Sequence, residues 1–136
     1  MIGLVLVTHG SLAAELRKAA EHVVGPMSGM ETVCIGPDDD LENARDAIRA
    51  AVNNVDGGGG VILLTDMFGG TPSNLAISLL KENKVEVLAG ANLPMLIKLS
   101  EARESASLSE AAQIAKTAGR RYIAIASQII AGETDE

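Results

Sequence analysis

His9 is the residue in this sequence whose type and position best suit chemistry. It follows the apolar run 2–7 and precedes Gly10, so we expect it at the tip of a buried strand and accessible to solvent. An imidazole with an ordinary pKa of about 6.5 is mostly neutral near pH 7, and one of its nitrogens then has a free lone pair. That lone pair can attack phosphorus, which makes His9 a candidate phosphoryl acceptor. The alternative is a structural histidine at a strand end.

Asp66 is the candidate partner of this histidine. It follows the apolar run 61–64, and its carboxylate can reach His9 if the two strands are neighbours. A carboxylate there would accept the proton of one ring nitrogen, fix the tautomer and stabilise the positive charge that develops on the ring. The alternative is that Asp66 only caps a turn.

The turn that follows Asp66 suits a phosphoryl group. Gly69 and Gly70 let backbone N–H groups approach closely, and Thr71 and Ser73 offer hydroxyls. Pro72 is expected to begin a helix, with Thr71 as its cap, whose positive end points to the same place. Phosphoryl transfer requires mainly positioning and charge stabilisation. Pattern alone leaves open a strand-to-helix turn that binds nothing.

Other features favour structural roles. His22 has no metal-ligand partner at a suitable spacing, and the acidic run 38–40 is typical of a solvated turn and a helix cap. The glycines at 57–60 precede a strand, so they indicate a surface turn rather than a phosphate loop. Cys34 lies in an apolar stretch and is predicted to be a small core residue. We therefore predict no metal and no cofactor. A hydrolase using His9, Asp66 and a serine would lack the Gly-x-Ser-x-Gly turn.

The elements that must position these residues alternate along the chain. Strands are expected at 2–7, 32–35, 61–64, 85–89 and 122–126, and helices at about 11–24, 41–55, 72–82, 94–104 and 107–119. This alternation predicts an α/β fold: a three-layer, doubly wound, mainly parallel sheet with helices on both faces. The last strand is expected to be antiparallel or exchanged between subunits. In such a sheet the turns after the first, third and fourth strands meet at one edge, where ligands bind.

Size and charge limit the classes of function. The 136 residues, 47% of them hydrophobic, predict a single domain at 1–130 followed by an acidic tail at 131–136. A net charge of -7 disfavours nucleic acids and anionic membranes as partners. The N-terminal apolar run is too short to cross a bilayer and no leader pattern accompanies it, so we expect a cytoplasmic protein without direct membrane insertion.

Four segments together resemble a known family. They are residues 2–10, the Gly36-Pro37 turn with its acidic continuation, the stretch from Thr65 to Ala76, and residues 89–96. In this order they are similar to the EIIA domain of the mannose family of the bacterial phosphoenolpyruvate-dependent sugar phosphotransferase system (PTS). A related branch that serves dihydroxyacetone kinase lacks the Gly-Gly-Thr-Pro pattern.

The resemblance implies a phosphotransferase that forms a phosphohistidine intermediate. His9 would accept a phosphoryl group from phospho-HPr and pass it to an EIIB domain, with Asp66 hydrogen-bonded to the histidine and Thr71 near the phosphoryl group. Met67 and Phe68, with Ser73, would line the rim that faces partner proteins. The family also implies a homodimer in which the last strand reaches toward the partner subunit.

Two interpretations of the role in the cell remain open. No EIIB domain follows the last strand, so we expect the acceptor to be a separate EIIB protein, in sugar uptake or in PTS-dependent regulation. The alternative is a regulatory module whose binding to partner proteins depends on phosphorylation of His9, without sugar transport.

Overall fold

Four short strands form a parallel sheet in the order β2-β1-β3-β4 in the computed structural model, which describes residues 1–132. The strands are β1 (Gly3–His9), β2 (Met30–Ile35), β3 (Val61–Thr65) and β4 (Val85–Ala89). Both central strands, β1 and β3, are mainly apolar and are buried except for His9 at the end of β1, because helices cover both faces of the sheet. The expected parallel α/β architecture is confirmed.

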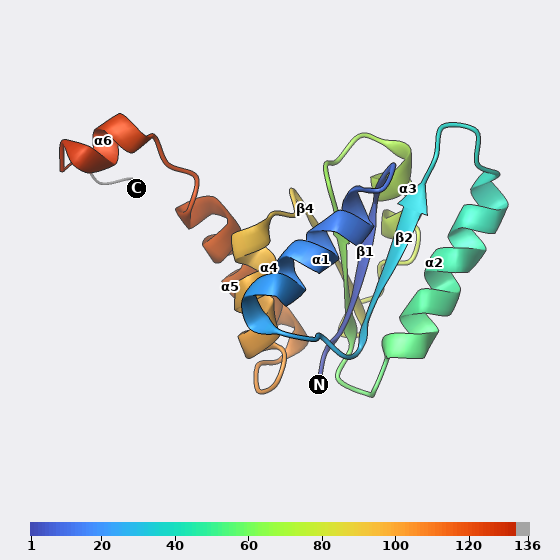
Figure 1. The fold of residues 1–136 in the computed structure, drawn as a ribbon. Coiled ribbons are helices and arrows are strands. Elements are labelled where there is room, and N and C mark those ends of the chain that lie inside the picture. The colour runs from blue at the N-terminus through green and yellow to red at the C-terminus, as the bar shows by residue number, and fades with distance from the viewer. Residues whose placement is uncertain (133–136) are drawn as a thin grey trace.

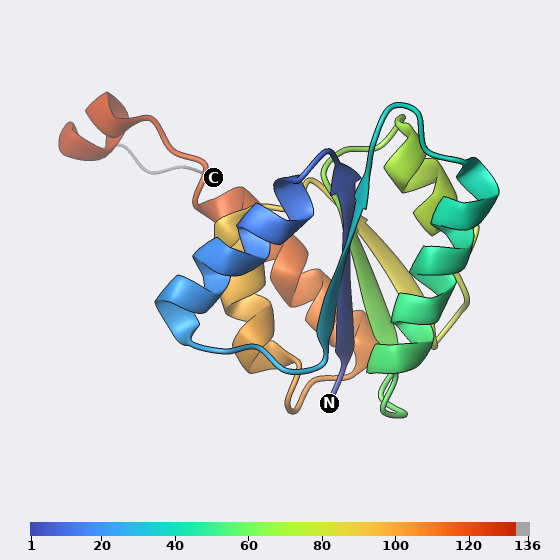
Figure 2. The same cartoon turned by 45° about the vertical axis from the view of Figure 1, so that its right-hand side comes forward.

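Helices cover the two faces unequally (Figures 1 and 2). On one face lie α1 (Leu12–Val24), α4 (Leu93–Ala102) and α5 (Leu108–Arg121); on the other lie α2 (Leu41–Val55) and α3 (Thr71–Ile77). Leu4, Leu6 and Leu64 pack under the first group, and Val5, Val7 and Leu63 under the second. Alternation along each strand thus separates the core into two apolar layers.

The segment 122–126, expected to be a strand, forms no strand within the described chain. Residues 123–125 have no regular structure, and α6 (Ala126–Ile130) follows them. The alternating apolar residues of this segment suit a strand, but a strand needs a neighbour for its backbone hydrogen bonds, and the segment runs away from the sheet (Figure 1). The sequence beyond residue 132, which holds most of the predicted acidic tail, lies outside the described residues.

Two further expectations need correction. The helix predicted at 72–82 is the seven-residue α3, which begins at Thr71 with Gly70 as its N-cap, so Thr71 is not the cap. Cys34 is exposed rather than buried, because β2 is an edge strand whose outer side is not covered. Asp40 caps α2 as expected, accepting hydrogen bonds from the N–H groups of Glu42 and Asn43 at 2.8 and 3.2 Å.

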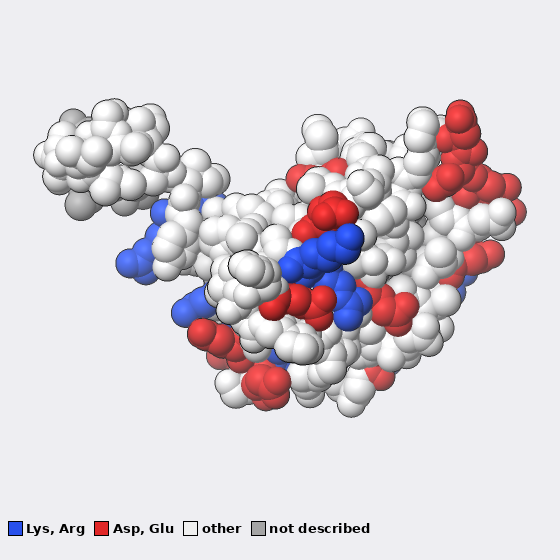
Figure 3. Space-filling model, viewed as in Figure 1, with Lys and Arg blue, Asp and Glu red and all other residues white. Residues whose placement is uncertain are grey.

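The carboxyl ends of all four strands lie at one edge of the sheet. The loops that leave β1 and β3 therefore lie side by side, and the acidic loop between β2 and α2 belongs to the same edge. Figure 3 shows acidic side chains gathered over this loop and the beginning of α2. Within residues 1–132, no helix combines the length and apolar content that crossing a bilayer requires.

Candidate functional site

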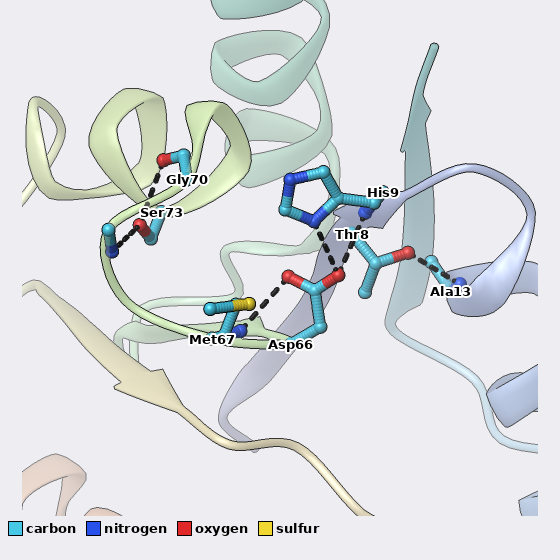
Figure 4. A network of polar contacts seen from close by, with 8 residues as sticks. Thr8, His9, Ala13, Asp66, Met67, Gly70 and Ser73 are labelled. Atoms are coloured by element: carbon cyan, nitrogen blue, oxygen red, sulfur yellow. Dashed lines mark hydrogen bonds and ion pairs between the residues drawn. The ribbon is translucent and has the colours of Figure 1, made fainter. Parts of the chain in front are cut away.

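His9 and Asp66 meet at the carboxyl edge of the sheet. Val7 of β1 pairs with Thr65 of β3, so the residues just beyond them converge. His9 is the last residue of β1, and Asp66 follows β3 directly. One carboxylate oxygen, Asp66 Oδ2, lies 2.8 Å from the ring nitrogen Nδ1 of His9 and accepts the backbone N–H of His9 at 3.0 Å (Figure 4). The predicted histidine–carboxylate pair is therefore present in the structure.

The carboxyl of Asp66 is held in its ionised form. Partial burial alone would raise its pKa. The hydrogen bonds donated by the backbone and ring of His9, the attraction to that ring and the hydrogen bond from the Met67 N–H together outweigh burial and hold the pKa of Asp66 below its ordinary value. The Met67 N–H donates to the second oxygen, Oδ1, at 3.0 Å. Asp66 is thus an ionised acceptor at neutral pH.

An ionised carboxylate decides the tautomer of the imidazole. A carboxylate can only accept hydrogen bonds, so Nδ1 of His9 must carry the proton in the 2.8 Å contact. In the neutral ring the other nitrogen, Nε2, then has the free lone pair. The side chain of His9 is 52% exposed whereas that of Asp66 is 15% exposed. The arrangement therefore presents a nucleophilic Nε2 at the surface, with its charge-stabilising partner behind it.

Gly70 lies against the other edge of the same ring. A Cβ at this position would be 2.7 Å from Cε1 and 2.9 Å from Nε2 of His9, closer than side-chain carbons approach other atoms. The backbone of Gly70 has φ -104° and ψ 173°, which any residue can adopt. Glycine is therefore required here by space next to Nε2 and not by backbone conformation.

If His9 accepts a phosphoryl group as the sequence predicts, Gly70→Ala should slow that step by about 100-fold, because the added methyl group would push the ring away from Asp66 by an appreciable fraction of an ångström. The fold should persist, since the backbone angles suit alanine. The measurement is the initial rate of phosphoryl transfer, with the melting temperature as a check on folding. Gly57→Ala is the matched control, because a Cβ there would approach nothing closer than 3.9 Å. A normal rate in Gly70→Ala would contradict the contact.

Two residues of the turn, Gly69 and Ser73, differ from their predicted roles. The N–H of Gly69 donates to Ser73 Oγ at 3.1 Å, so this group is not free to bind a phosphoryl group as predicted. Gly69 has a φ of +95°, which explains the glycine. Ser73, predicted at the partner-facing rim, is fully buried because it lies on the inner side of α3. Thr71 is exposed at the beginning of the helix, beside Gly70.

Met67 and Phe68 form an exposed apolar rim beside His9. Their exposed fractions are 58% and 57%, which is high for side chains of this size. Large apolar side chains that remain in water next to a reactive group are typical of a protein-binding surface. The position agrees with the rim predicted from sequence, while their role in binding stays a prediction.

Thr8 is a site residue that sequence reasoning missed. Its buried hydroxyl accepts the N–H of Ala13 at 2.7 Å and so holds the loop that joins His9 at the end of β1 to α1 (Figure 4). Ser11, the N-cap of α1, makes no side-chain capping bond. A threonine in an apolar run was the available signal, because a buried hydroxyl needs a partner.

Comparison with known proteins decides the family. The model of the family described as "PTS system fructose IIA component" matches residues 3–116. The chain belongs to this EIIA family. It is therefore a component of the sugar phosphotransferase system, and a role in phosphoryl transfer follows from that membership.

Individual relatives agree with this family. The mannose-specific EIIAB component of Escherichia coli (strain K12) is 32% identical over 124 residues, which cover 90% of this EIIA chain and 38% of that protein. The chain thus spans well under half the length of this relative. The fructose-specific EIIA component of Bacillus subtilis (strain 168) is 24% identical, with 94% of this chain and 88% of that protein covered.

A solved structure supports the same fold. The PTS IIA protein associated with the fucose utilization operon of Streptococcus pneumoniae superimposes with a TM-score of 0.82 at 27% identity, covering 93% of this chain and 95% of that one. The observed sheet and helices are therefore those of an EIIA protein.

Proposed function

We propose that this EIIA chain carries a phosphoryl group on Nε2 of His9, taking it from phospho-HPr and passing it to an EIIB domain on a separate protein. The observation that carries the proposal is the 2.8 Å contact of Nδ1 with the ionised Asp66, which leaves Nε2 as the nitrogen with a lone pair. Residues 1–130 are proposed to form the single domain that does this.

The transfer step can be written with every atom in place. Nε2 of His9 attacks phosphorus, the Nε2–P bond forms, and the bond between phosphorus and the donor nitrogen breaks. The donor imidazole keeps that bonding pair. The Nδ1 proton of His9 remains in its hydrogen bond to Asp66, whose negative charge stabilises the ring as positive charge develops on it. In delivery, a nucleophile of the EIIB domain attacks phosphorus, the Nε2–P bond breaks, and Nε2 of His9 keeps the bonding pair.

The exposed groups near Nε2 fit a transient phosphoryl group. The Thr71 hydroxyl is accessible, and the Gly70 and Thr71 N–H groups donate to no acceptor within the described part of the chain. We propose that Gly70 and Thr71 bind the phosphoryl oxygens. Met67 and Phe68 would then contact the donor and acceptor proteins in turn, which explains why they are apolar and exposed.

Reconstituted transfer tests this function. Phosphoenolpyruvate, Enzyme I and HPr should label the purified chain with one acid-labile phosphate, and the isolated labelled chain should return its phosphate to HPr or pass it to a cognate EIIB. Labelling that requires HPr and is reversible supports the carrier role. A chain that stays unlabelled, or holds an acid-stable phosphate, would contradict it. Labelling with no transfer to any cognate EIIB would favour the regulatory module instead.

We also propose that the chain is a homodimer. Five apolar side chains of the segment 122–130 are more than half exposed: Tyr122, Ile123, Ile125, Ile129 and Ile130. The edge strand β4 is bordered by a groove of about 450 Å³ with the apolar Val87 and the cationic Lys116 and Arg120 along it. A second copy that contributes the 122–130 segment along β4 would bury these isoleucines and extend the sheet.

The double substitution Ile125→Asp and Ile129→Asp should convert the dimer to a monomer, because each charge would have to be buried at the interface. Light scattering coupled to size-exclusion chromatography measures the mass. Val23→Asp, an exposed apolar position on α1, is the control and should leave the mass at twice that of one chain. A wild-type chain that is monomeric at high concentration would rule the dimer out.

A further inference from the structure

The hydroxyl of Ser73 is buried beside the site and takes no direct part in the proposed transfer step. The residue is 0% exposed. Its Oγ accepts the Gly69 N–H at 3.1 Å and donates to the Gly70 carbonyl oxygen at 3.0 Å (Figure 4). Both hydrogen-bonding functions of the hydroxyl are thus directed to the two glycines that precede α3, and the side chain bridges them from inside the fold.

This bridge acts on the glycine that touches the imidazole. The Gly70 carbonyl is held by the Ser73 hydroxyl and by the Asn74 N–H, at 3.0 Å each. Its α-carbon faces Cε1 and Nε2 of His9 so closely that a methyl group would not fit. The position of this backbone therefore sets both the room available at Nε2 and the freedom of the ring to turn away from Asp66.

We propose that Ser73 is a positioning residue for phosphoryl transfer, acting through Gly70 on the imidazole of His9. The inference rests on the proposed function of His9 and adds a part to it. Hydrogen bonds on both sides of the Gly69–Gly70 turn fix Gly70 against the ring edge, so that the lone pair of Nε2 points to the space where phosphorus arrives. Small errors in such placement have large effects on rate.

Comparison with other serines of the chain separates this role from ordinary helix packing. Ser78, which follows the last residue of α3, and Ser100 in α4 each donate to the carbonyl three residues earlier, at 2.5 and 2.6 Å. Among the described residues, no second hydrogen bond is made by either hydroxyl. Ser73 also donates to the carbonyl three residues earlier, but that carbonyl belongs to the site turn, and its hydroxyl additionally accepts the Gly69 N–H. The second bond is what ties the turn to the helix.

Ser73→Ala should lower kcat for phosphorylation by phospho-HPr about 10-fold or more while leaving KM unchanged. The KM should hold because the donor is expected to contact the exposed Met67 and Phe68, and the hydrogen bonds of Ser73 go to Gly69 and Gly70 instead. A role in packing alone would not produce this split. Ser100→Ala is the matched control, since it removes a helix hydroxyl beside Arg103, at the opposite end of the sheet, and should change neither constant.

Two more variants separate the hydrogen bonds from volume. Ser73→Cys keeps the shape of the side chain but weakens both hydrogen bonds, so it should be as slow as Ser73→Ala. Ser73→Thr keeps the hydroxyl and should recover most of the wild-type kcat. If Ser73→Ala does not fold, as judged by its thermal transition, the comparison of Ser73→Cys with Ser73→Thr decides.

The kinetic results can separate a failure of the Ser73 positioning role from a failure of the proposed carrier function of His9. Wild-type kcat in both Ser73→Ala and Ser73→Cys would overturn the positioning role while leaving His9 as the acceptor. A raised KM with unchanged kcat would also overturn it, and would mean that Ser73 supports the partner-binding surface and not the imidazole. Failure of the wild-type chain to accept phosphate at all would instead remove the proposed function itself.

Discussion

His9→Ala should abolish phosphorylation of the chain, with no detectable label when the wild type is fully labelled. The reason is that the substitution removes the atom that bonds to phosphorus, and the structure provides no second imidazole with an ionised partner within the described residues. The fold should persist, because the side chain of His9 is half exposed at the strand tip and contributes little to the core. Labelling from phospho-HPr and a thermal melt measure the two effects.

His22→Ala supplies the matched control for this experiment. His22 is the second histidine of the chain and lies exposed in the last turn of α1. The control variant should be labelled at the wild-type rate and to the wild-type extent. Retained label in His9→Ala, or lost label in His22→Ala, would place the acceptor outside the site described here.

Asp66→Asn should slow phosphoryl transfer to His9 by about 100-fold. An amide with its oxygen toward His9 still accepts the Nδ1 proton but brings no negative charge to stabilise the developing imidazolium. In the wild type, the second carboxylate oxygen accepts the Met67 N–H at 3.0 Å. In the variant, that orientation places the amide NH2 there, so two hydrogen-bond donors face each other. The single-turnover rate with phospho-HPr measures the effect.

Asp56→Asn is the control for charge and backbone hydrogen bonding. Asp56 follows α2 and accepts the Gly58 N–H at 3.0 Å, at the edge of the sheet opposite His9. The Asp56→Asn variant loses the same charge without touching the site, so the rate of phosphoryl transfer to this variant should equal the wild-type rate. Equal rates in both variants and the wild type would mean that the carboxylate of Asp66 does not assist the transfer.

The lowered pKa of Asp66 also predicts a pH dependence of stability. Because the folded pKa is depressed, the contribution of this carboxylate is fully present above its unfolded pKa of about 3.9 and is lost as pH falls through the folded value. The difference in free energy of unfolding between wild type and Asp66→Asn should therefore shrink as the pH falls below about 4. Denaturant titrations at several pH values measure it, and a difference independent of pH would contradict the assignment.

The sequence predicted the sheet well because its strands are strongly patterned. The apolar runs at 2–7 and 61–64 are too short for buried helices, and amphipathic helices separate them along the chain. Parallel strands are the structure that fits both observations. The pairing of His9 with Asp66 followed from the same topology, since carboxyl ends of parallel strands share an edge. Both depend on local periodicity and on general rules of α/β folds.

The residues that sequence reasoning misplaced depend on contacts between elements. Whether Ser73 faces solvent or core is decided by where α3 begins and how it lies on β1 and β3, and a shift of one residue in the helix start changes the answer. The close approach of Gly70 to the ring is a distance between two loops, which composition does not encode. For residues 122–126 the local pattern favoured a strand, but the structure lacks a neighbouring strand beside this segment in the described chain.

The direct test of the central claim is the identity of the phosphorylated ring nitrogen. Nuclear magnetic resonance of the chain labelled with ¹⁵N-histidine correlates the carbon-bound ring protons of His9 with both nitrogens before and after phosphorylation. The geometry predicts phosphorus on Nε2 of His9, with Nδ1 still protonated and hydrogen-bonded to Asp66. Phosphorus on Nδ1, or on His22, would contradict the account.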